Sequence, residues 1–375
     1  MKNRIRLYVD GGNRLTKIME EAKKPFSFPT IISEPGMELS YGTSFDLFDL
    51  HPTTTNIDFN NMLVEIIKDG ESLGKKLVGR AAENKGVLIR DRNRYEKKSN
   101  DEVILFCLLT GIASNLVKYE KDQQPIDITI NQPLVEYVAN QKNLSNLYGE
   151  KLKGNVKVLY YNTSNTSEVI KEATYDIENI TLCPEGIAPF FHHAVNENGT
   201  LKEAYTKDKK TVVFDIGSGQ INIAAFDGLK TVGVNTFEKG MMDCYEKISM
   251  MLFNNFREKL DRKPYTYDID NMIRYHNKIL KGKKGEGINT SNIVENVFDT
   301  FAYELNKDFR EFVKTKFIGN CDTAIFCGGG SEILFPYLDH YLSNDFTCIK
   351  SDTGEYHNVI GSMYYRIYKD AASNL

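Results

Sequence analysis

Two stretches of the chain, residues 5–19 and 212–226, repeat one pattern in which a glycine-rich turn with a leading aspartate separates two apolar runs. The first turn reads DGGN (residues 10–13) and the second reads DIGSG (residues 215–219). Glycine tolerates the positive φ of tight turns between antiparallel strands, so each stretch is predicted to be a β-hairpin. One such hairpin in each half of the chain indicates an internal repeat of two similar α/β domains, each offering a glycine-rich loop to one cleft.

Hydrophobic periodicity predicts the elements around these hairpins. Strands are expected at residues 4–9, 15–19, 29–32, 61–68, 73–78, 126–130, 156–161, 180–183, 211–214, 220–226 and 324–327. Helices are expected at residues 101–119, with Asn100 as the N-cap, and at residues 241–260, 294–316, 331–342 and 358–369. Asp69 and Gly70 are expected to form a two-residue turn between a further pair of strands.

Charge and cysteine usage argue against several classes of protein. The net charge of −4 argues against a protein that coats nucleic acid. The basic runs at residues 90–98 and 278–284 are interpreted as solvated faces or loops. Six cysteines without a CxxC pair indicate reduced thiols packed as small hydrophobic groups. The N-terminal residues enter a strand directly, without a signal peptide or a membrane anchor, so we expect a soluble, cytoplasmic protein.

The two turns carry groups that suit a polyphosphate. Lys17 adds a positive charge that reaches a phosphoryl oxygen. Asp10 and Asp215 would lie on either side of the phosphates, where two carboxylates hold Mg²⁺ through its retained waters. Unobstructed backbone N–H groups would form a nest for the anion, and they are expected at Gly11, Gly12, Asn13, Gly217, Ser218, Gly219 and Gln220. An ordinary hairpin explains either turn alone, but an aspartate at the same place in both favours a nucleotide site.

A third glycine-rich segment, Gly328, Gly329 and Gly330, follows the apolar run at residues 324–327. Glycines there would let the backbone lie close under a flat base and ribose, where any Cβ would intrude. A flexible loop is the alternative. As the third glycine-rich turn in this order, the segment is interpreted as a nucleoside platform that accommodates ATP or GTP.

Residues 10–17, 215–219 and 328–330 resemble the phosphate 1, phosphate 2 and adenosine motifs of the superfamily of actin, the 70-kDa heat-shock chaperones and sugar kinases. Three further stretches resemble the bacterial actin-like plasmid-segregation proteins, ParM and its relatives: LVGRAA (77–82), INQPL (130–134) and CPEGIAPFF (183–191). The resemblance covers nearly the whole chain. It departs in the second turn, which reads GSGQ where relatives often have GGTT, so Ser218 is left to replace one threonine hydroxyl.

This resemblance implies an actin-like ATPase fold, with two RNase H-like α/β domains flanking a nucleotide cleft. Domain I would comprise residues 1–185 and about 345–375, and domain II residues 186–344. Glu185 would position the attacking water and act with Asp215 in catalysis, although an acid near a helix start is an alternative interpretation. Gly240 would precede the adenine-contacting helix, and Arg274 and Lys278 would lie near the base.

Three roles are compatible with such a cleft: a polymerising ATPase, a small-molecule kinase of the sugar or acetate type, and a chaperone ATPase. No chain is left for a peptide-binding domain, and no acceptor-side aspartate of a kinase is identified, so both alternatives are disfavoured. A membrane-attached filament of the MreB kind would carry an amphipathic N-terminal segment. The sequence therefore predicts a filament of identical subunits that uses ATP or GTP with Mg²⁺. It would move plasmid DNA indirectly, through a DNA-binding adaptor protein, and would not bind membranes.

Overall fold

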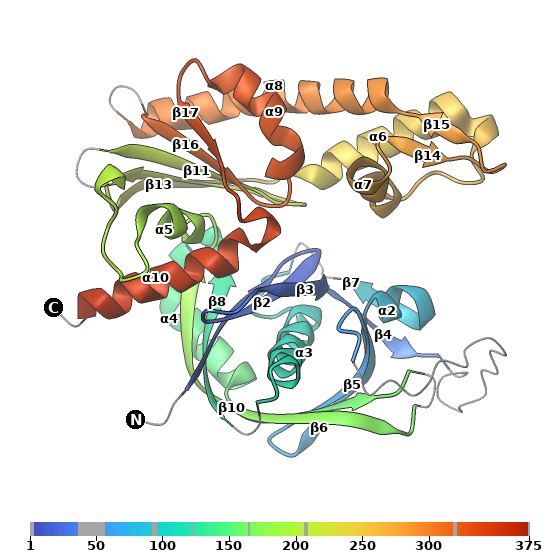
Figure 1. Ribbon diagram of the computed structural model, residues 1–375, viewed down its shortest axis with the longest axis vertical. Helices are drawn as coiled ribbons and strands as arrows, with labels where there is room; N and C mark the ends of the chain where they lie inside the picture. The colour runs from blue at the N-terminus through green and yellow to red at the C-terminus, as the bar shows by residue number, and fades with distance from the viewer. Residues whose placement is uncertain are drawn as a thin grey trace. The chain divides into compact units, whose positions relative to one another are not determined.

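The chain divides into two compact units, each described here by itself (Figure 1). The computed structural model describes residues 4–36, 57–91, 96–121, 124–163, 166–205, 209–317 and 321–373. The first unit comprises Met1–Thr200 and Asn358–Leu375, and the second comprises Leu201–His357. The sequence placed the boundaries at 185/186 and about 345. The second unit extends past 345 because β17 (Thr347–Lys350) pairs with β16 (Thr323–Cys327) in its sheet.

The first unit is built on a sheet that has ten strands among the described residues, in the order β3-β2-β1-β8-β10-β9-β5-β6-β4-β7. The strands are β1 (Ile5–Gly11), β2 (Leu15–Glu20), β3 (Phe26–Pro29), β4 (Ile31–Pro35), β5 (Asn61–Lys68), β6 (Glu71–Gly79), β7 (Gly86–Asp91), β8 (Pro125–Gln132), β9 (Gly154–Tyr161) and β10 (Val169–Pro184). β1 pairs antiparallel with β2 and parallel with β8, which in turn pairs parallel with β10. Figure 1 shows the sheet curving round helix α3 (Glu102–Lys118).

Helix α3 begins one residue after its N-cap, Asp101. The Asp101 Oδ1 atom accepts hydrogen bonds from the backbone N–H groups of Val103 (2.9 Å) and Ile104 (3.1 Å). These are two of the donors that the first turn of a helix leaves unpaired. The prediction that Asn100 caps this helix is therefore wrong by one residue.

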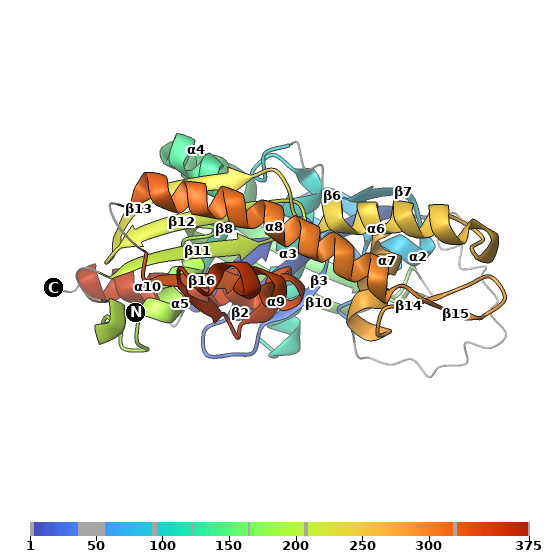
Figure 2. The same ribbon diagram turned by 90° about the horizontal axis from the view of Figure 1, so that it is seen from above.

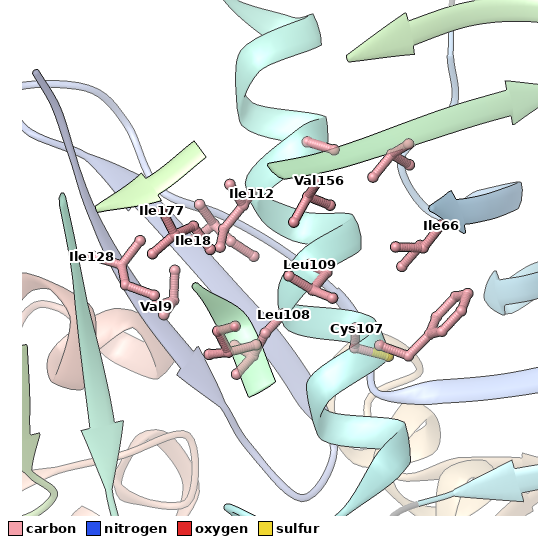
Figure 3. Close-up of a cluster of buried hydrophobic side chains, with 14 of the residues drawn as sticks. Val9, Ile18, Ile66, Cys107, Leu108, Leu109, Ile112, Ile128, Val156 and Ile177 are labelled. Carbon is pink, nitrogen blue, oxygen red and sulfur yellow. The ribbon is translucent and has the colours of Figure 1, made fainter. Parts of the chain in front are cut away.

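The core of the first unit lies between α3 and the curved sheet (Figure 3). The packed side chains include Val9, Ile18, Ile66, Leu108, Leu109, Ile112, Ile128, Val156 and Ile177. Gly111 permits close contact, since a Cβ there would lie 2.2 Å from Ile18 Cδ1. Each Leu, Ile or Val side chain that is fully buried contributes about 1.5–3 kcal/mol relative to an exposed one. The remaining helices of the unit are α2 (Arg80–Lys85), α4 (Leu134–Leu152), α5 (Ala188–Ala194) and α10 (His357–Ser373), which starts at the last residue of the second unit.

Within its described residues, the second unit has a five-stranded sheet in the order β13-β12-β11-β16-β17. Its elements are β11 (Lys210–Ile216), β12 (Ile221–Asp227), β13 (Lys230–Phe237), the helices α6 (Met241–Phe256), α7 (Thr266–Tyr275), α8 (Ser291–Lys316) and α9 (Ser331–Leu342), and a small hairpin of β14 (Ile279–Lys281) and β15 (Gly287–Asn289). Figure 2 shows the long helix α8 running along the sheet. Phe309 of α8 stacks on Phe214 of β11 with ring centroids 4.0 Å apart, and Phe214 stacks on Phe326 of β16 at 5.0 Å.

The two sheets repeat one topology, which confirms the predicted internal repeat. In the second unit β11 pairs antiparallel with β12 and parallel with β16, which pairs parallel with β17. The strands β1, β2, β8 and β10 have the same order and directions in the first unit. Both glycine-rich turns are hairpins: Asp10 lies opposite Lys17, and Asp215 lies opposite Asn222. The turn at Asp69 and Gly70 is confirmed as well, with β5 and β6 paired antiparallel up to Lys68 and Glu71.

Several elements differ from the sequence prediction. The expected strand at residues 29–32 is divided, since β3 ends at Pro29 and β4 begins at Ile31. The strand expected at 180–183 begins at Val169, in a stretch where buried and more exposed residues alternate. Helix α6 ends at Phe256 and is followed by a 3-10 turn. The helices α4, α5 and α7 were not predicted, because polar residues or prolines interrupt their apolar spacing. Among the described residues, no helix has both the length and the apolar character needed to cross a membrane.

Candidate functional site

The β1–β2 turn places an acid and a lysine side by side in the first unit. Asp10 is 2% exposed, near the end of β1. Its Oδ2 atom accepts a hydrogen bond from Lys17 Nζ at 3.1 Å. The backbone N–H of Gly12 donates to the carbonyl of Leu15 at 3.0 Å and closes the turn. Asn13 Oδ1 is buried without a hydrogen-bond partner in the described part of the chain. The Gly12 N–H is therefore engaged within the turn, and Lys17 is the charged group that lies beside the buried acid.

Close approach of the backbone, rather than positive φ, explains one glycine in each turn, Gly12 and Gly217. No positive φ occurs at the four turn glycines, Gly11, Gly12, Gly217 and Gly219. A Cβ at Gly12 would lie 2.7 Å from the carbonyl oxygen three residues later, and a Cβ at Gly217 would lie 2.8 Å from the corresponding oxygen in its own turn. Tolerance of positive φ, which a hairpin turn offers as an explanation for Gly217 and Gly219, is therefore not what these positions use. Glycine is required because each turn folds back onto its own backbone.

Lys98 joins two of the predicted site residues. Its Nζ donates to Asp10 Oδ1 at 3.1 Å and also to Glu185 Oε1. The Lys98 side chain is 3% exposed. A buried ammonium requires neutralisation, which the two carboxylates provide. The interpretation of residues 90–98 as a solvated basic face is therefore wrong for Lys98. Composition gave no sign of this, because one lysine in a basic run looks like the others.

Glu185 follows the last residue of β10 and lies before helix α5. Its backbone N–H donates to the carbonyl of Gln132 at 2.8 Å, which fixes it at the end of β8. The first turn of α5 contains no acidic residue, and its N-cap is Ile187. Glu185 lies two residues before this N-cap, so the alternative interpretation of an acid near a helix start remains open. Its ion-pair partner is Lys98.

The INQPL segment (residues 130–134) lies at the end of β8, next to Glu185. The Tyr148 hydroxyl donates to Gln132 Oε1, and Gln132 Nε2 donates to Glu136 Oε2, both at 2.7 Å. Glu136 Oε1 accepts from the backbone N–H of Lys98 at 3.3 Å. Asn131, next to Gln132, is fully buried, and neither its amide oxygen nor its amide nitrogen has a partner within the described ranges. This segment therefore holds the backbone of Lys98 in place.

Asp215 is the corresponding acid in the second unit. It is 4% exposed and lies beside Cys327 of the neighbouring strand β16. His357 Nε2 lies 2.7 Å from Asp215 Oδ1, and His357 Nδ1 lies 3.1 Å from the Gly354 carbonyl oxygen. Burial raises the pKa of the Cys327 thiol well above its ordinary value, and the Asp215 charge adds to this effect. The thiol is therefore neutral near pH 7. His357 was not anticipated from the sequence, since it follows an irregular stretch with no motif.

The β11–β12 turn packs against the start of α6 through Gly240. The backbone N–H groups of Met241 and Met242 donate to the carbonyls of Gly217 (3.2 Å) and Ser218 (2.8 Å). A Cβ at Gly240 would lie 2.5 Å from the Ser218 oxygen. Gly240 is therefore a contact point between this turn and α6. Gln220 Nε2 donates to Glu238 at 2.7 Å.

The three glycines after β16 have different roles. Gly328 has φ +88°, and a Cβ there would lie 2.4 Å from the Ile216 carbonyl oxygen. The Gly330 N–H donates to that same oxygen at 2.9 Å. Packing on the end of β11 thus accounts for Gly328 and Gly330. Gly329 is open above its Cα, where a Cβ would meet its nearest neighbour only at 3.9 Å. Its carbonyl accepts from Arg274 at 2.9 Å.

Arg274 and Lys278 lie in separate polar networks of the second unit. Arg274 Nε donates to buried Asp270 at 2.9 Å, and the Tyr245 hydroxyl donates to the same oxygen at 2.6 Å. Lys278 pairs with Glu295. Glu295 lines a pocket of about 580 Å³ formed by Ile273, Lys278, Glu295, Phe298, Asp299, Ile333, Pro336, Tyr337 and His340. Arg274 therefore lies against the glycine segment, whereas Lys278 does not.

One protein-family model matches a large part of the first unit. Residues 9–187 match the family model described as the N-terminal domain of actin-like proteins. A search of curated proteins finds no match.

Solved structures match the whole chain. Actin-like protein Alp7A matches with a TM-score of 0.72 at 16% identity, over 99% of this chain and 98% of that one. A non-polymerisable quadruple mutant of pCBH ParM gives 0.70 at 18% identity, over 98% and 100%. Bacillus thuringiensis ParM with ATP gives 0.70 at 17% identity, over 98% and 100%. The fold is that of the actin-like proteins. The fold prediction made from the sequence is therefore confirmed.

The match to the actin-like N-terminal domain contains the whole cluster of Asp10, Lys17, Lys98 and Glu185. The four residues come from β1, from β2, from the segment before α3 and from the end of β10. The actin-like fold thus brings together side chains that lie far apart in sequence. The predicted roles of these residues, and of those in the second unit, remain predictions.

Proposed function

We propose that this actin-like chain is an ATPase, or a GTPase, that assembles into filaments in response to nucleotide. The observation that carries the proposal is the charged cluster at the β1–β2 turn, where Lys98 links Asp10 to Glu185. The likeness in fold to Bacillus thuringiensis ParM with ATP and with AMPPNP supports a nucleotide as the ligand.

The proposed reaction is hydrolysis of the γ-phosphate. The backbone of the two glycine-rich turns and Lys17 bind the phosphates, and Glu185 accepts a hydrogen bond from the attacking water. The water oxygen forms a bond to the γ-phosphorus as the bond from that phosphorus to the β–γ bridging oxygen breaks. ADP keeps the bridging oxygen, one water proton passes to Glu185 and then to solvent, and inorganic phosphate leaves.

Mg²⁺ fits this site only through its water shell. Both oxygens of Asp10 already accept from ammonium groups, which would repel a directly bound cation. Each carboxylate oxygen has a second lone pair that accepts from a metal-bound water. At Asp215 the neighbouring donors are a thiol and an imidazole, whereas Mg²⁺ prefers oxygen ligands. Bound Mg²⁺ would supply charge neutralisation at the phosphates, and Asp10 and Asp215 are the carboxylates that would accept from its waters.

The mechanical output that we propose is a filament of identical subunits that segregates plasmid DNA through a DNA-binding adaptor. Five of the similar structures carry the name ParM, and one of these five is a quadruple mutant described as non-polymerisable. The net charge of −4 agrees with indirect contact to DNA.

Light scattering by the purified protein tests the proposal. Addition of ATP and Mg²⁺ should raise scattering above a critical concentration, electron micrographs of the same sample should show filaments, and phosphate should be released. ADP is the matched control and should support less assembly. If neither ATP nor GTP raises scattering, the filament proposal fails. If ADP production accelerates only when a sugar or acetate is added, the protein is a small-molecule kinase.

A further inference from the structure

Lys98 is a buried cation at the point where two proposed functional acids meet. Asp10 lies on β1 and Glu185 directly follows β10, and β8 separates these two strands in the sheet. The two acids are therefore not neighbours on adjacent strands. A lysine from outside the sheet bridges them, and only 3% of its side chain is exposed to solvent.

The backbone of Lys98 is fixed by its surroundings. The N–H groups of Asn100 and Asp101 donate to the carbonyl of Lys97, and Asp101 caps α3. Lys151 of α4 donates to the Ser99 carbonyl at 2.9 Å. The lysine thus projects from a segment tied to two helices. A rigid support of this kind is what a side chain needs to act on a reacting group.

Stability alone gives a poor account of this arrangement. Removing charges from water offsets most of the attraction between them, so a buried ion pair adds little net stability over well-packed apolar groups. With Lys17 included, the cluster contains two ammonium groups and two carboxylates and is electrically neutral. In the described part of the chain Lys98 Nζ donates to two carboxylates, whereas an ammonium has three N–H groups. One donor is thus left for an anion beside the phosphate-binding turn.

We propose that Lys98 is a catalytic lysine that donates this third N–H to an oxygen of the γ-phosphate while it holds Glu185 in position. This inference rests on the proposed hydrolase function. As the bond to the leaving ADP breaks, charge shifts within the phosphate groups, and a fixed cation beside them lowers the barrier. One side chain would then couple the acid that orients the water to the group that the water attacks.

The test compares Lys98→Met with Lys76→Met. Lys76 is a matched control, because it is also a buried lysine of the first unit and pairs with Glu34 at 2.6 Å, at a distance in the sheet from Asp10 and Glu185. Single-turnover hydrolysis should fall about 10²–10³-fold in Lys98→Met, as it does when one preorganised donor is removed from an active site. It should stay within about threefold of wild type in Lys76→Met.

Binding measurements separate a catalytic from a structural role. Calorimetric titration with Mg²⁺ and either AMPPNP or ADP should show that Lys98→Met binds AMPPNP about tenfold more weakly and ADP within about threefold of wild type. Lys98→Arg, which keeps the charge, should recover part of the hydrolysis. If Lys98→Met hydrolyses ATP at the wild-type rate, or weakens AMPPNP and ADP equally, the proposal is overturned.

Two further outcomes remain decisive. If Lys98→Met does not fold, Lys98→Gln takes its place, because its amide still donates to the carboxylates but carries no charge, and the same losses are expected. If the wild-type protein binds nucleotide without hydrolysing it, the proposed hydrolase function fails. The AMPPNP-to-ADP ratio in the variants then still decides whether Lys98 contacts the γ-phosphate.

Discussion

The two glycine-rich turns have the same topology but different chemical surroundings. Asp10 and Asp215 each lie near the end of the first strand of a hairpin, beside a parallel strand, and both are buried. Two ammonium groups contact Asp10, and one of them also binds Glu185. Asp215 instead has an imidazole at 2.7 Å and a neutral thiol on the next strand. The repeat thus fixes where an acid lies, and segments outside the hairpins supply the partners that differ most, Lys98 at Asp10 and His357 at Asp215.

The partner groups come from comparable places in the two units. Lys98 lies just before the N-cap of α3, and His357 is the first residue of α10. Segments at the starts of helices therefore place a nitrogen-bearing side chain beside each acid. One acid therefore has a lysine amine beside it and the other a histidine imidazole. We infer that the two halves of the repeat have diverged in the chemistry that they support.

Removal of each acid should have the largest effect and should separate the two turns. Asp10→Ala and Asp215→Ala should both reduce hydrolysis by at least about 10²-fold, because the proposed mechanism uses each carboxylate to accept from metal-bound water. Asp10→Ala should also lower the free energy of unfolding by about 3–5 kcal/mol, because it leaves two buried ammonium groups with one carboxylate. Asp215→Ala should cost less, since only one ion-pair partner, His357, lies against Asp215 where two ammonium groups lie against Asp10. Single-turnover kinetics and urea unfolding measure the two effects.

Equal losses of stability in these two variants would contradict the comparison. Asp127→Ala serves as a control, because Asp127 is an acid of the same sheet whose partners Asn179 and Arg4 lie away from the turn. It should leave hydrolysis unchanged. If Asp215→Ala hydrolyses the nucleotide at the wild-type rate, Asp215 is not part of the catalytic site.

Glu185→Ala should reduce turnover without preventing assembly. Loss of the carboxylate that orients the water should slow phosphate release about 10²–10⁴-fold. Nucleotide binding and filament growth should persist, so the filaments should be longer-lived. Phosphate release and light scattering after nucleotide depletion measure the two properties. Filaments that disassemble at the wild-type rate would show that Glu185 does not act in hydrolysis. The matched control is Glu178→Ala, on β10, the strand that Glu185 directly follows.

The turn glycines should respond alike despite the different acids beside them. Gly12→Ala and Gly217→Ala would each bring a Cβ within 2.7–2.8 Å of a backbone oxygen. Each should lower the free energy of unfolding by about 1–3 kcal/mol through overpacking. The control Gly70→Ala has open space but a φ of +88°, so it should cost about 1–2 kcal/mol through backbone strain alone. Thermal unfolding compares the three, and a large difference between Gly12→Ala and Gly217→Ala would show that the turns are not equivalent.

The sequence predicted the hairpins and the repeat because they rest on local signals. Apolar alternation and glycine-rich turns specify which residues pair, as Asp10 with Lys17 shows. Asn100 was assigned as the α3 cap because both neighbouring residues are good caps, and only the backbone geometry distinguishes Asp101.

The partners of the acids could not be predicted in the same way. Lys98 is 88 residues from Asp10 and 87 from Glu185, and His357 is far from Asp215 in sequence. Nothing in a basic run marks the one lysine that becomes buried, because burial depends on how α3 and α4 pack on the sheet. Contacts of this range follow from the tertiary fold. Hydrophobic periodicity is a local signal, so it does not predict contacts between residues this far apart in sequence.

The smallest expected effect concerns two cysteines next to the acids. Cys183 lies two residues before Glu185, and Cys327 lies beside Asp215, and burial raises the pKa of both thiols well above the ordinary value. Only the thiolate is a good nucleophile, so both should resist alkylation by iodoacetamide at about pH 8 in the folded protein. Half-buried Cys348, whose pKa is raised to about 12 chiefly by burial, should react first, although slowly. Mass spectrometry of the labelled peptides gives the order, with urea-unfolded protein as the fully reactive control. Faster labelling of Cys327 than of Cys183 would show that the strand ends at Asp215 open more readily than those at Glu185. Equal protection of the two thiols would show that the two turns differ only in the charged groups around their acids.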